Sequence, residues 1–283
     1  MVAAETSSSD VENDLSPVLA RPPMPEYIGG LWFRRHFIAT VPMNHVRSTN
    51  MDTVLGNLWF LVNPALQTVV YFLIFGVLLD TDRGIDDYLT YLVIGVLSFT
   101  FITSAMLAAA RCLEVNLTLI RSMYFPRAAI PISTTLASFY TFVPSLLVMV
   151  GLVLATGNLP SWRWLLFPVV LTMLVSLTLG VVFVVARLGK AVPDLQQLLS
   201  HIIRILFYCS GVLFAPESFT SDERVLWLFR INPFFELIEL LRWVFLGRSA
   251  SWEIWVMAGG WSVAFPVVGA WYFWRGETSY GTS

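Results

Sequence analysis

Glu236, Glu239 and Arg242 recur at three-residue spacing, so a helix would place all three on one face. Carboxylates at helical spacing occur in the metal sites of membrane proteases, where histidines complete the ligand set. The chain has three histidines, none of which lies near this cluster in the sequence, and it contains no His-Glu-x-x-His. An ion pair within one helix therefore explains these residues better than a catalytic metal site does.

Residues for nucleotide chemistry are also missing from the sequence. A phosphate loop of the form Gly-x4-Gly-Lys-Ser/Thr does not occur. Cys112 and Cys209 are too few and too far apart for a disulfide framework or a metal site. The net charge of −2 argues against a nucleic-acid partner. We therefore predict no catalytic residue, metal or cofactor within this chain.

Polar and aromatic side chains inside a long apolar run form a second group of candidates. Asn57, Asn63 and Gln67 recur within one run, which continues with Tyr71 and Phe72. Polar side chains in a membrane helix should turn away from lipid, toward a water-filled path or a neighbouring helix. Aromatic rings offer flat apolar faces of the kind on which sugar rings stack. These five residues are candidates for lining a channel, and helix–helix hydrogen bonding is the alternative for the polar three.

A later run, 195–215, carries four further candidates, which are His201, Arg204, Phe207 and Tyr208. A charge in hydrocarbon costs about 2.5–3.5 kcal/mol, so His201 and Arg204 should face a cavity, a partner or the membrane interface. The fork of donors on an arginine fits phosphate oxygens, which makes this pair a candidate contact for a diphosphate group. Snorkelling of both side chains to the inner headgroups is the alternative.

The elements that carry these residues are membrane helices by composition. Hydrophobic residues make up 57% of the chain, charged residues 13%, and the mean hydropathy is +0.71, whereas soluble proteins carry about 25% charged residues. One helical crossing needs about 20 apolar residues. The sequence predicts an all-α integral membrane protein with six transmembrane helices, at 54–79, 88–110, 131–156, 162–186, 195–215 and 252–274.

Basic residues alternate between the connections of these six helices. The connection 80–87 holds four aspartates and one arginine, whereas 111–129 holds three arginines and one glutamate. The connection 187–194 is basic again, and 157–161 has no basic residue. Because basic connections remain in the cytoplasm, both termini, including a C-terminal tail at 276–283, are predicted to be cytoplasmic in a multi-pass protein of the cytoplasmic membrane.

Three further segments flank or interrupt the predicted spans. Residues 1–25 are acidic and rich in serine and proline, which predicts a disordered cytoplasmic tail. Residues 26–50 begin with aromatic side chains beside arginines, which predicts an interfacial amphipathic helix followed by a linker. Residues 222–247 are apolar but too charged to span, and Asn232 and Pro233 divide them. We therefore predict a re-entrant helix pair that enters from the outer side before the last span.

Three sequence blocks occur in a recognisable order, namely TVLGNLWFLVNPALQTVVYFLIFG (53–76), NLTLIRSMYFPRAAIP (116–131) and NPFFELIELLRWVFLG (232–247). They resemble the first span, the first cytoplasmic loop and the closing segment of permeases in the ABC-2 class of polysaccharide exporters, the Wzm and TagG group. The resemblance assigns 51–275 to an ABC-2 type transmembrane domain. The second cytoplasmic loop departs from the pattern, because this chain reads GKAVPDL where the family often has Arg-Asp.

The resemblance implies a set of partners and contacts. Two copies of the chain would pair with two separate ATP-binding cassette subunits, which bind ATP and magnesium, and would form a channel for a lipid-linked glycan. Arg121 and Arg127 in the first cytoplasmic loop, and Asp194 in the second, would contact the ATP-binding subunits. For the two arginines, positive charge that only orients the protein in the membrane is the alternative.

The resemblance also limits the substrate to classes handled by that family, which are O-antigen, teichoic acid and cell-wall galactan. One lysine against sixteen arginines suggests a high-GC genome and so favours an actinobacterial galactan exporter. A drug or lipid exporter of the same class is the near alternative. An integral-membrane glycosyltransferase or protease is the alternative from another class, and it would need clustered carboxylates or histidines within the membrane.

Overall fold

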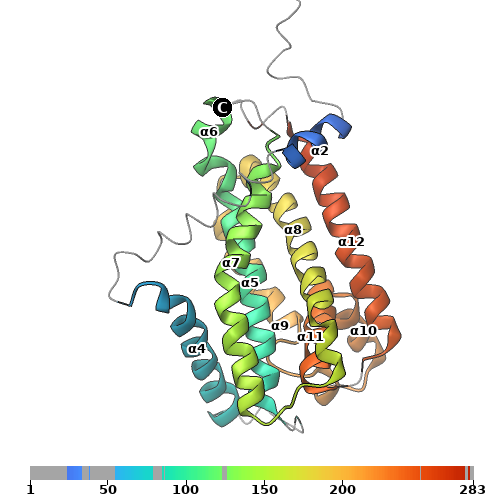
Figure 1. Ribbon diagram of the computed structural model, residues 1–283. Helices are drawn as coiled ribbons and strands as arrows, with labels where there is room; N and C mark the ends of the chain where they lie inside the picture. Colours follow the sequence, from blue (N-terminus) through green and yellow to red (C-terminus); the bar gives the residue numbers. More distant parts are fainter. Residues whose placement is uncertain are drawn as a thin grey trace, which may run out of the picture.

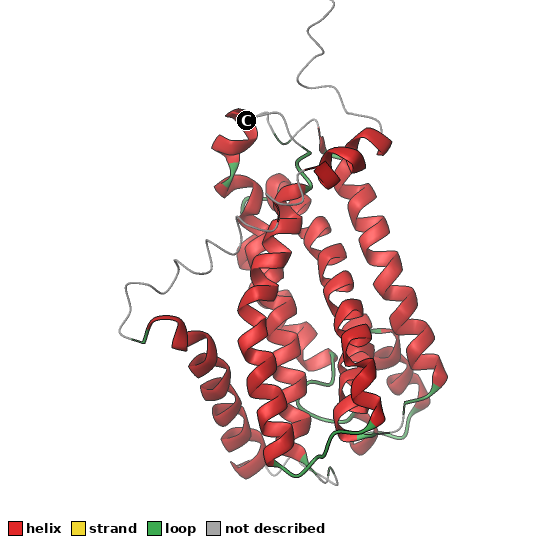
Figure 2. Ribbon diagram, viewed as in Figure 1, coloured by secondary structure: helices red, strands yellow, loops and turns green. Residues whose placement is uncertain are grey.

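The computed structural model describes residues 24–33, 38, 55–78, 85, 87–122, 126–248, 250–277 and 280. Across these residues every regular element is helical and no strand occurs (Figures 1 and 2), which confirms the predicted all-α class. Several predictions fall outside the described residues: the tail at 1–23, the linker at 39–54, the loop at 79–84, the end at 281–283 and the side chain of Asn57.

Among the residues that the structure describes, five helices are long and apolar enough to cross a membrane. They are α4 (Trp59–Tyr71) with its π-helical continuation η2 (Phe72–Leu78), α5 (Tyr88–Val115), α7 (Ala129–Ala155), α8 (Phe167–Ala191) with the preceding 3-10 turn η3 (Trp162–Leu166), and α12 (Trp252–Arg275). They correspond to the first four and the last of the predicted spans. The helices run further than predicted at Val115 and Ala191, so the connections on that side are shorter than the sequence indicated.

The predicted fifth span, 195–215, is interrupted. Helix α9 (Leu195–Cys209) has 15 residues, which is about 22 Å and shorter than the ~30 Å hydrocarbon layer. The chain turns at Gly211, whose φ of +57° lies in the left-handed region that glycine adopts readily. A 3-10 turn, η4 (Pro216–Ser218), follows. Of the six predicted transmembrane helices, the described residues therefore contain five that are long enough to span, and the predicted fifth one is not among them.

The shorter helices are α2 (Met24–Phe33), η1 (Gly56–Leu58), α6 (Leu117–Ser122), α10 (Glu223–Ile231) and α11 (Pro233–Leu246). Helix α2 overlaps the predicted interfacial helix and begins at Met24, two residues before the predicted segment 26–50. Helices α10 and α11 match the predicted pair within 222–247, and the break between them is at Asn232 as predicted.

Helix α5 lies at the centre of the bundle and packs against α7, α8, α9 and α11. Helices α8 and α12 lie backbone to backbone at Gly180 and Gly269. A Cβ atom on either glycine would overlap backbone atoms of the opposite helix. Small residues at such crossings let membrane helices pack backbone to backbone, so these glycines hold α8 against α12.

Helix α4 lies at the edge of the bundle (Figure 1). It packs against α5 and α7 and leaves a row of large apolar side chains exposed. The row includes Leu61, Leu66, Val69, Val70 and Leu73. None of the described residues covers this row, so lipid or another protein segment must cover it in the membrane.

Connections predicted on the same side of the membrane do lie at the same end of the bundle. At one end, the Asn158 amide donates to the Asp87 carboxylate, and the hydroxyls of Thr90 and Thr156 are 2.8 Å apart. At the other end, α2 and α6 lie together with the end of α12 (Figure 1). The predicted alternation of connections is therefore present in the fold.

Candidate functional site

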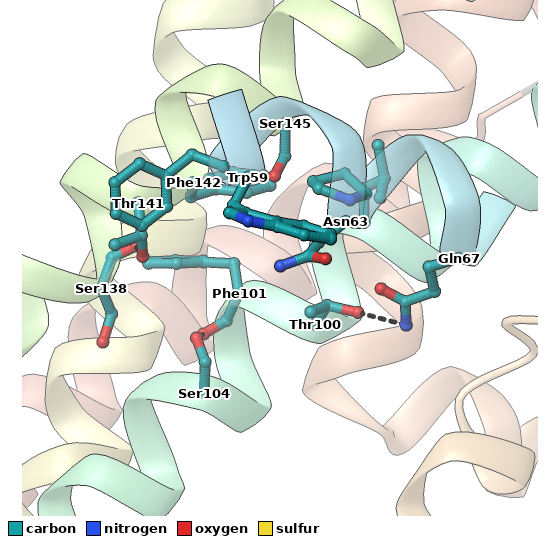
Figure 3. Close-up of a pocket in the computed structure, with 13 residues that line it drawn as sticks. Trp59, Asn63, Gln67, Thr100, Phe101, Ser104, Ser138, Thr141, Phe142 and Ser145 are labelled. Carbon is teal, nitrogen blue, oxygen red and sulfur yellow. Dashed lines mark hydrogen bonds between the residues drawn. The ribbon is translucent and has the colours of Figure 1, made fainter. Parts of the chain in front are cut away.

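A cavity of about 170 Å³ lies between α4, α5 and α7 (Figure 3). Two of the predicted channel residues, Asn63 and Gln67, line it. The other lining residues are Trp59, Phe60, Pro64, Leu97, Thr100, Phe101, Ser104, Ser138, Thr141, Phe142 and Ser145. Aromatic rings and small hydroxyls therefore share one cavity within the membrane helices.

Hydrogen bonding leaves this cavity rich in acceptors. Thr100, Ser104 and Thr141 each donate their hydroxyl hydrogen to a backbone carbonyl of their own helix, in each case at 2.8 Å. Gln67 Nε2 donates to Thr100 Oγ1 at 3.2 Å, which ties α4 to α5. The helix–helix alternative is thus confirmed for Gln67, whereas the Asn63 amide points toward the cavity and is bound to none of the described residues (Figure 3).

Tyr71 and Phe72 do not line that cavity but belong to an aromatic cluster further along α4. The Tyr71 ring lies 5.7 Å from that of Phe207 on α9, and Phe207 lies 5.4 Å from Phe99 on α5. Tyr208 lies 5.6 Å from Phe207. The structure therefore joins the predicted aromatics of the first and fifth spans into one group, although they are remote in the sequence.

Helix α9 has two different faces. Leu195 and Leu199 are buried against the bundle, whereas His201, Arg204 and Tyr208 are exposed. The spacing of these three exposed residues places them on one side of the helix. A face that carries an arginine and a histidine in a membrane bundle must meet water, headgroups or another chain.

The three predicted coupling residues lie at the α6 end of the bundle but in different settings. Arg121, on α6, and Asp194, which precedes α9, are exposed. Arg127 is partly buried and bound within the chain. Its backbone N–H donates to Glu277 Oε1 at 3.0 Å, and its guanidinium donates to the Glu277 carbonyl. Sequence reasoning missed Glu277, because nothing in the spacing connects a residue after the last helix with the first loop.

Asn232 makes the break between α10 and α11. Its Oδ1 atom accepts from the Phe234 N–H at 3.0 Å and so caps α11. Its Nδ2 atom donates to the Cys209 carbonyl and the Ser210 hydroxyl, both at 3.0 Å. Pro233 occupies the first position of α11, where no backbone donor is needed. The break therefore also holds the end of α9.

Arg242 on α11 is fully buried and confirms the predicted ion pair. Its Nη1 atom lies 2.6 Å from Glu239 Oε1. The guanidinium also donates to the carbonyls of Gly211 (3.0 Å), Val212 (3.0 Å) and Tyr91 (3.3 Å). The interrupted segment after α9 is therefore held to α5 and α11 by one side chain.

Glu236 does not join this ion pair, although the sequence placed it on the same helix face. It is fully buried, and its two carboxylate oxygens are bound to none of the residues that the structure describes. In the same residues, no three His, Cys, Asp or Glu side chains come together as metal ligands.

Comparison with known proteins places this fold in a family. The model of the ABC-2 type transporter family matches residues 46–246. The O-antigen export system permease protein RfbA of Myxococcus xanthus is 24% identical over 215 residues, which cover 76% of this chain and 82% of that protein. The protein of that name from Klebsiella pneumoniae is 26% identical over 203 residues, 71% of this chain and 77% of its own. The polysialic acid transport protein KpsM of Escherichia coli is 22% identical over 197 residues, 66% of this chain and 72% of its own.

The family match begins before α4 and ends at the last residue of α11. It therefore includes the cavity, the aromatic cluster, the exposed face of α9 and the break at Asn232. The chain belongs to the ABC-2 type transporter family, as a multi-pass membrane permease that carries no catalytic domain and whose ATP is bound by a partner subunit.

Proposed function

We propose that this chain is the permease of an exporter that moves a lipid-linked polysaccharide across the cytoplasmic membrane. The names of its relatives, an O-antigen export permease and a polysialic acid transport protein, support this substrate class. The observation that carries the proposal is the exposed face of α9, where His201 and Arg204 lie on the same side as Tyr208. The donors of an arginine and a histidine suit the oxygens of a diphosphate, and the neighbouring rings suit sugars.

A second copy of the chain completes the channel. Helices α4 and α9 meet through Tyr71 and Phe207, and both leave large side chains exposed. Two-fold pairing of these surfaces would cover the apolar row of α4 and enclose His201 and Arg204 in a shared aqueous path. Leaving the two basic residues in lipid instead would cost several kcal/mol, on the order of 2.5–3.5 for the arginine alone.

The α6 end of the bundle faces the cytoplasm in this proposal. There Arg121 and Asp194 are exposed and would face the ATP-binding subunits. The opposite end of the bundle faces outward, and there α10 and α11 form the re-entrant helix pair. Helix α9 and residues 210–215 together cross the membrane as the fifth of six spans. An irregular backbone is tolerated at that depth because the carbonyls of Gly211 and Val212 are bonded to Arg242 rather than exposed to lipid.

Transport in reconstituted vesicles tests this function. The chain and its ATP-binding subunit are placed in inside-out vesicles with polyprenyl-diphosphate-linked O-antigen, teichoic acid or galactan. We expect one glycan class to move into the lumen with ATP. Arg204→Met should lower the rate about tenfold or more, the scale of losing a hydrogen bond to a charged group.

Arg224→Met is the matched control, because Arg224 is also an exposed arginine but lies on α10. It should leave the rate unchanged. Movement of a drug or a simple lipid in place of every glycan would contradict the substrate class. Equal rates for the two arginine variants would contradict the role of the α9 face.

A further inference from the structure

Glu277 lies at the centre of a buried contact between three remote segments. It follows α12 and is 6% exposed. One carboxylate oxygen accepts from the Arg127 N–H at 3.0 Å, and the other accepts from the Tyr27 hydroxyl at 2.8 Å. Its backbone carbonyl accepts from the Arg127 guanidinium. We call Tyr27, Arg127, Ala128 and Glu277 the Glu277 clasp.

The Tyr27 hydroxyl closes the clasp by bonding in two directions. It donates to Glu277 and accepts from the Ala128 N–H at 2.9 Å. Tyr27 is 4% exposed. Burial and the nearby Glu277 carboxylate both raise the pKa of the Tyr27 phenol, so the phenol keeps the proton that it donates. Helix α2 is thereby tied both to the first loop and to the C-terminal segment.

A further contact keeps the clasp in register. Gly30 of α2 packs so closely on Pro126 that a Cβ atom there would lie 2.9 Å from the proline ring. Helix α2 is therefore held against the first loop by packing as well as by the Tyr27 hydroxyl. Outside the clasp, Tyr280 donates to the Phe273 carbonyl at 2.7 Å and packs its ring 4.7 Å from that of Phe273, so its hydroxyl bonds back onto its own segment of the chain.

The location of the clasp connects it to the partner-facing surface. Arg127 and Ala128 directly precede α7, and the same loop carries α6 with the exposed Arg121. A force on α6 can reach α7 along the chain and through Ile120, which lies in the same buried cluster as Ala128 and Ala129. If the loop were held at α7 alone, part of any displacement would be lost in loop bending.

We propose that Glu277 is a positioning residue for energy coupling. Through the clasp it locks the start of α7 to α2 and to the end of α12, so that movement of α6 by the ATP-binding subunit is transmitted to the three helices together. This inference rests on the proposed function. It assigns a role in transport to two segments, α2 and the C-terminal segment, which both lie outside the matched family region, 46–246.

Two substitutions break the clasp with minimal change in volume. Glu277→Gln leaves one acceptor oxygen, which cannot serve both Tyr27 and Arg127 in the present geometry. Tyr27→Phe removes the hydroxyl and leaves the buried Ala128 N–H unpaired. Tyr280→Phe is the matched control, because it also removes a buried tyrosine hydroxyl at this end of the bundle, but one that bonds only within the C-terminal segment.

The measurement uses the full complex with its ATP-binding subunit. Hydrogen exchange of the backbone N–H groups of residues 127 and 128 should accelerate about fivefold in Tyr27→Phe and in Glu277→Gln, the scale of one buried hydrogen bond. The number of ATP molecules hydrolysed per glycan exported should rise by a similar factor. Tyr280→Phe should leave both quantities unchanged.

The outcomes separate the clasp from the proposed function. Faster exchange with an unchanged ATP ratio, or unchanged exchange, would overturn the inference, as would equal effects of Tyr280→Phe and Tyr27→Phe. Because both contacts belong to one network, the double variant Tyr27→Phe/Glu277→Gln should be less impaired than the product of the two single effects. A wild-type complex that moved no glycan would instead refute the proposed function, and the exchange comparison would still decide whether the clasp holds the loop.

Discussion

Arg242 is the residue whose loss should destabilise the bundle most sharply. Its guanidinium is bonded to Glu239 and to three backbone carbonyls of two other segments. Arg242→Met should cost about 3–5 kcal/mol, because it leaves one carboxylate and those carbonyls without their donor. Thermal unfolding of the detergent-solubilised protein measures this loss.

Arg230→Met is the control at the same scale, since Arg230 is exposed on α10. It should change stability by less than about 0.5 kcal/mol. If the two variants had the same unfolding temperature, the network around Arg242 would not contribute to stability. The sequence located the Glu239–Arg242 pair from helical spacing, but the carbonyl partners come from residues 91, 211 and 212 and are visible only in the fold.

At the scale of elements, the break between α10 and α11 should depend on Asn232 more than on Pro233. Asn232 caps α11 and donates two hydrogen bonds to the end of α9. Asn232→Ala should therefore cost at least the roughly 0.5–2 kcal/mol of a lost cap. Pro233→Ala should cost less than about 1 kcal/mol, because the first helical position needs no backbone donor and the cap remains.

The unfolding midpoints of the two variants, measured under the same conditions, show which substitution destabilises the protein more. A larger loss for Pro233→Ala would show that the proline, rather than the asparagine cap, maintains the break. The sequence correctly indicated where the break falls, because Asn-Pro acts on its own backbone. It did not indicate that the same asparagine also ends α9, since that contact joins residues 22 and 23 positions apart.

For the whole molecule, labelling of single cysteines from outside the cell tests the proposed orientation. On a background that lacks Cys112 and Cys209, Leu159→Cys should react with an impermeant reagent in intact cells. Leu159 is 80% exposed and lies next to Asn158, which is bonded to Asp87 at that end of the bundle. Arg121→Cys, at the other end, should react only after the membrane is permeabilised. The reverse labelling pattern would show that the protein has the opposite orientation in the membrane.

The class of the protein and the positions of most helices could be predicted from the amino-acid sequence. Five apolar runs became five long helices, and the helical pair before the last one divided at Asn232. These features depend on local properties, because a helix in lipid must satisfy its own backbone and needs about 20 apolar residues to do so. The spacing of Asn63 and Gln67 likewise pointed to inward-facing side chains, and both line the cavity.

In contrast, the end of the fifth predicted span and the partner of Arg127 depend on how the helices pack together. Helix α9 stops at Cys209 because Arg242 and Asn232, from a later segment, take up the backbone carbonyls that follow or end it. Arg127 was predicted from its charge and loop position, yet its guanidinium binds a backbone carbonyl at the C-terminal end of the chain. Backbone carbonyls are present at every residue and leave no mark in the sequence, so which of them a buried arginine reaches is determined by the packing of the helices alone.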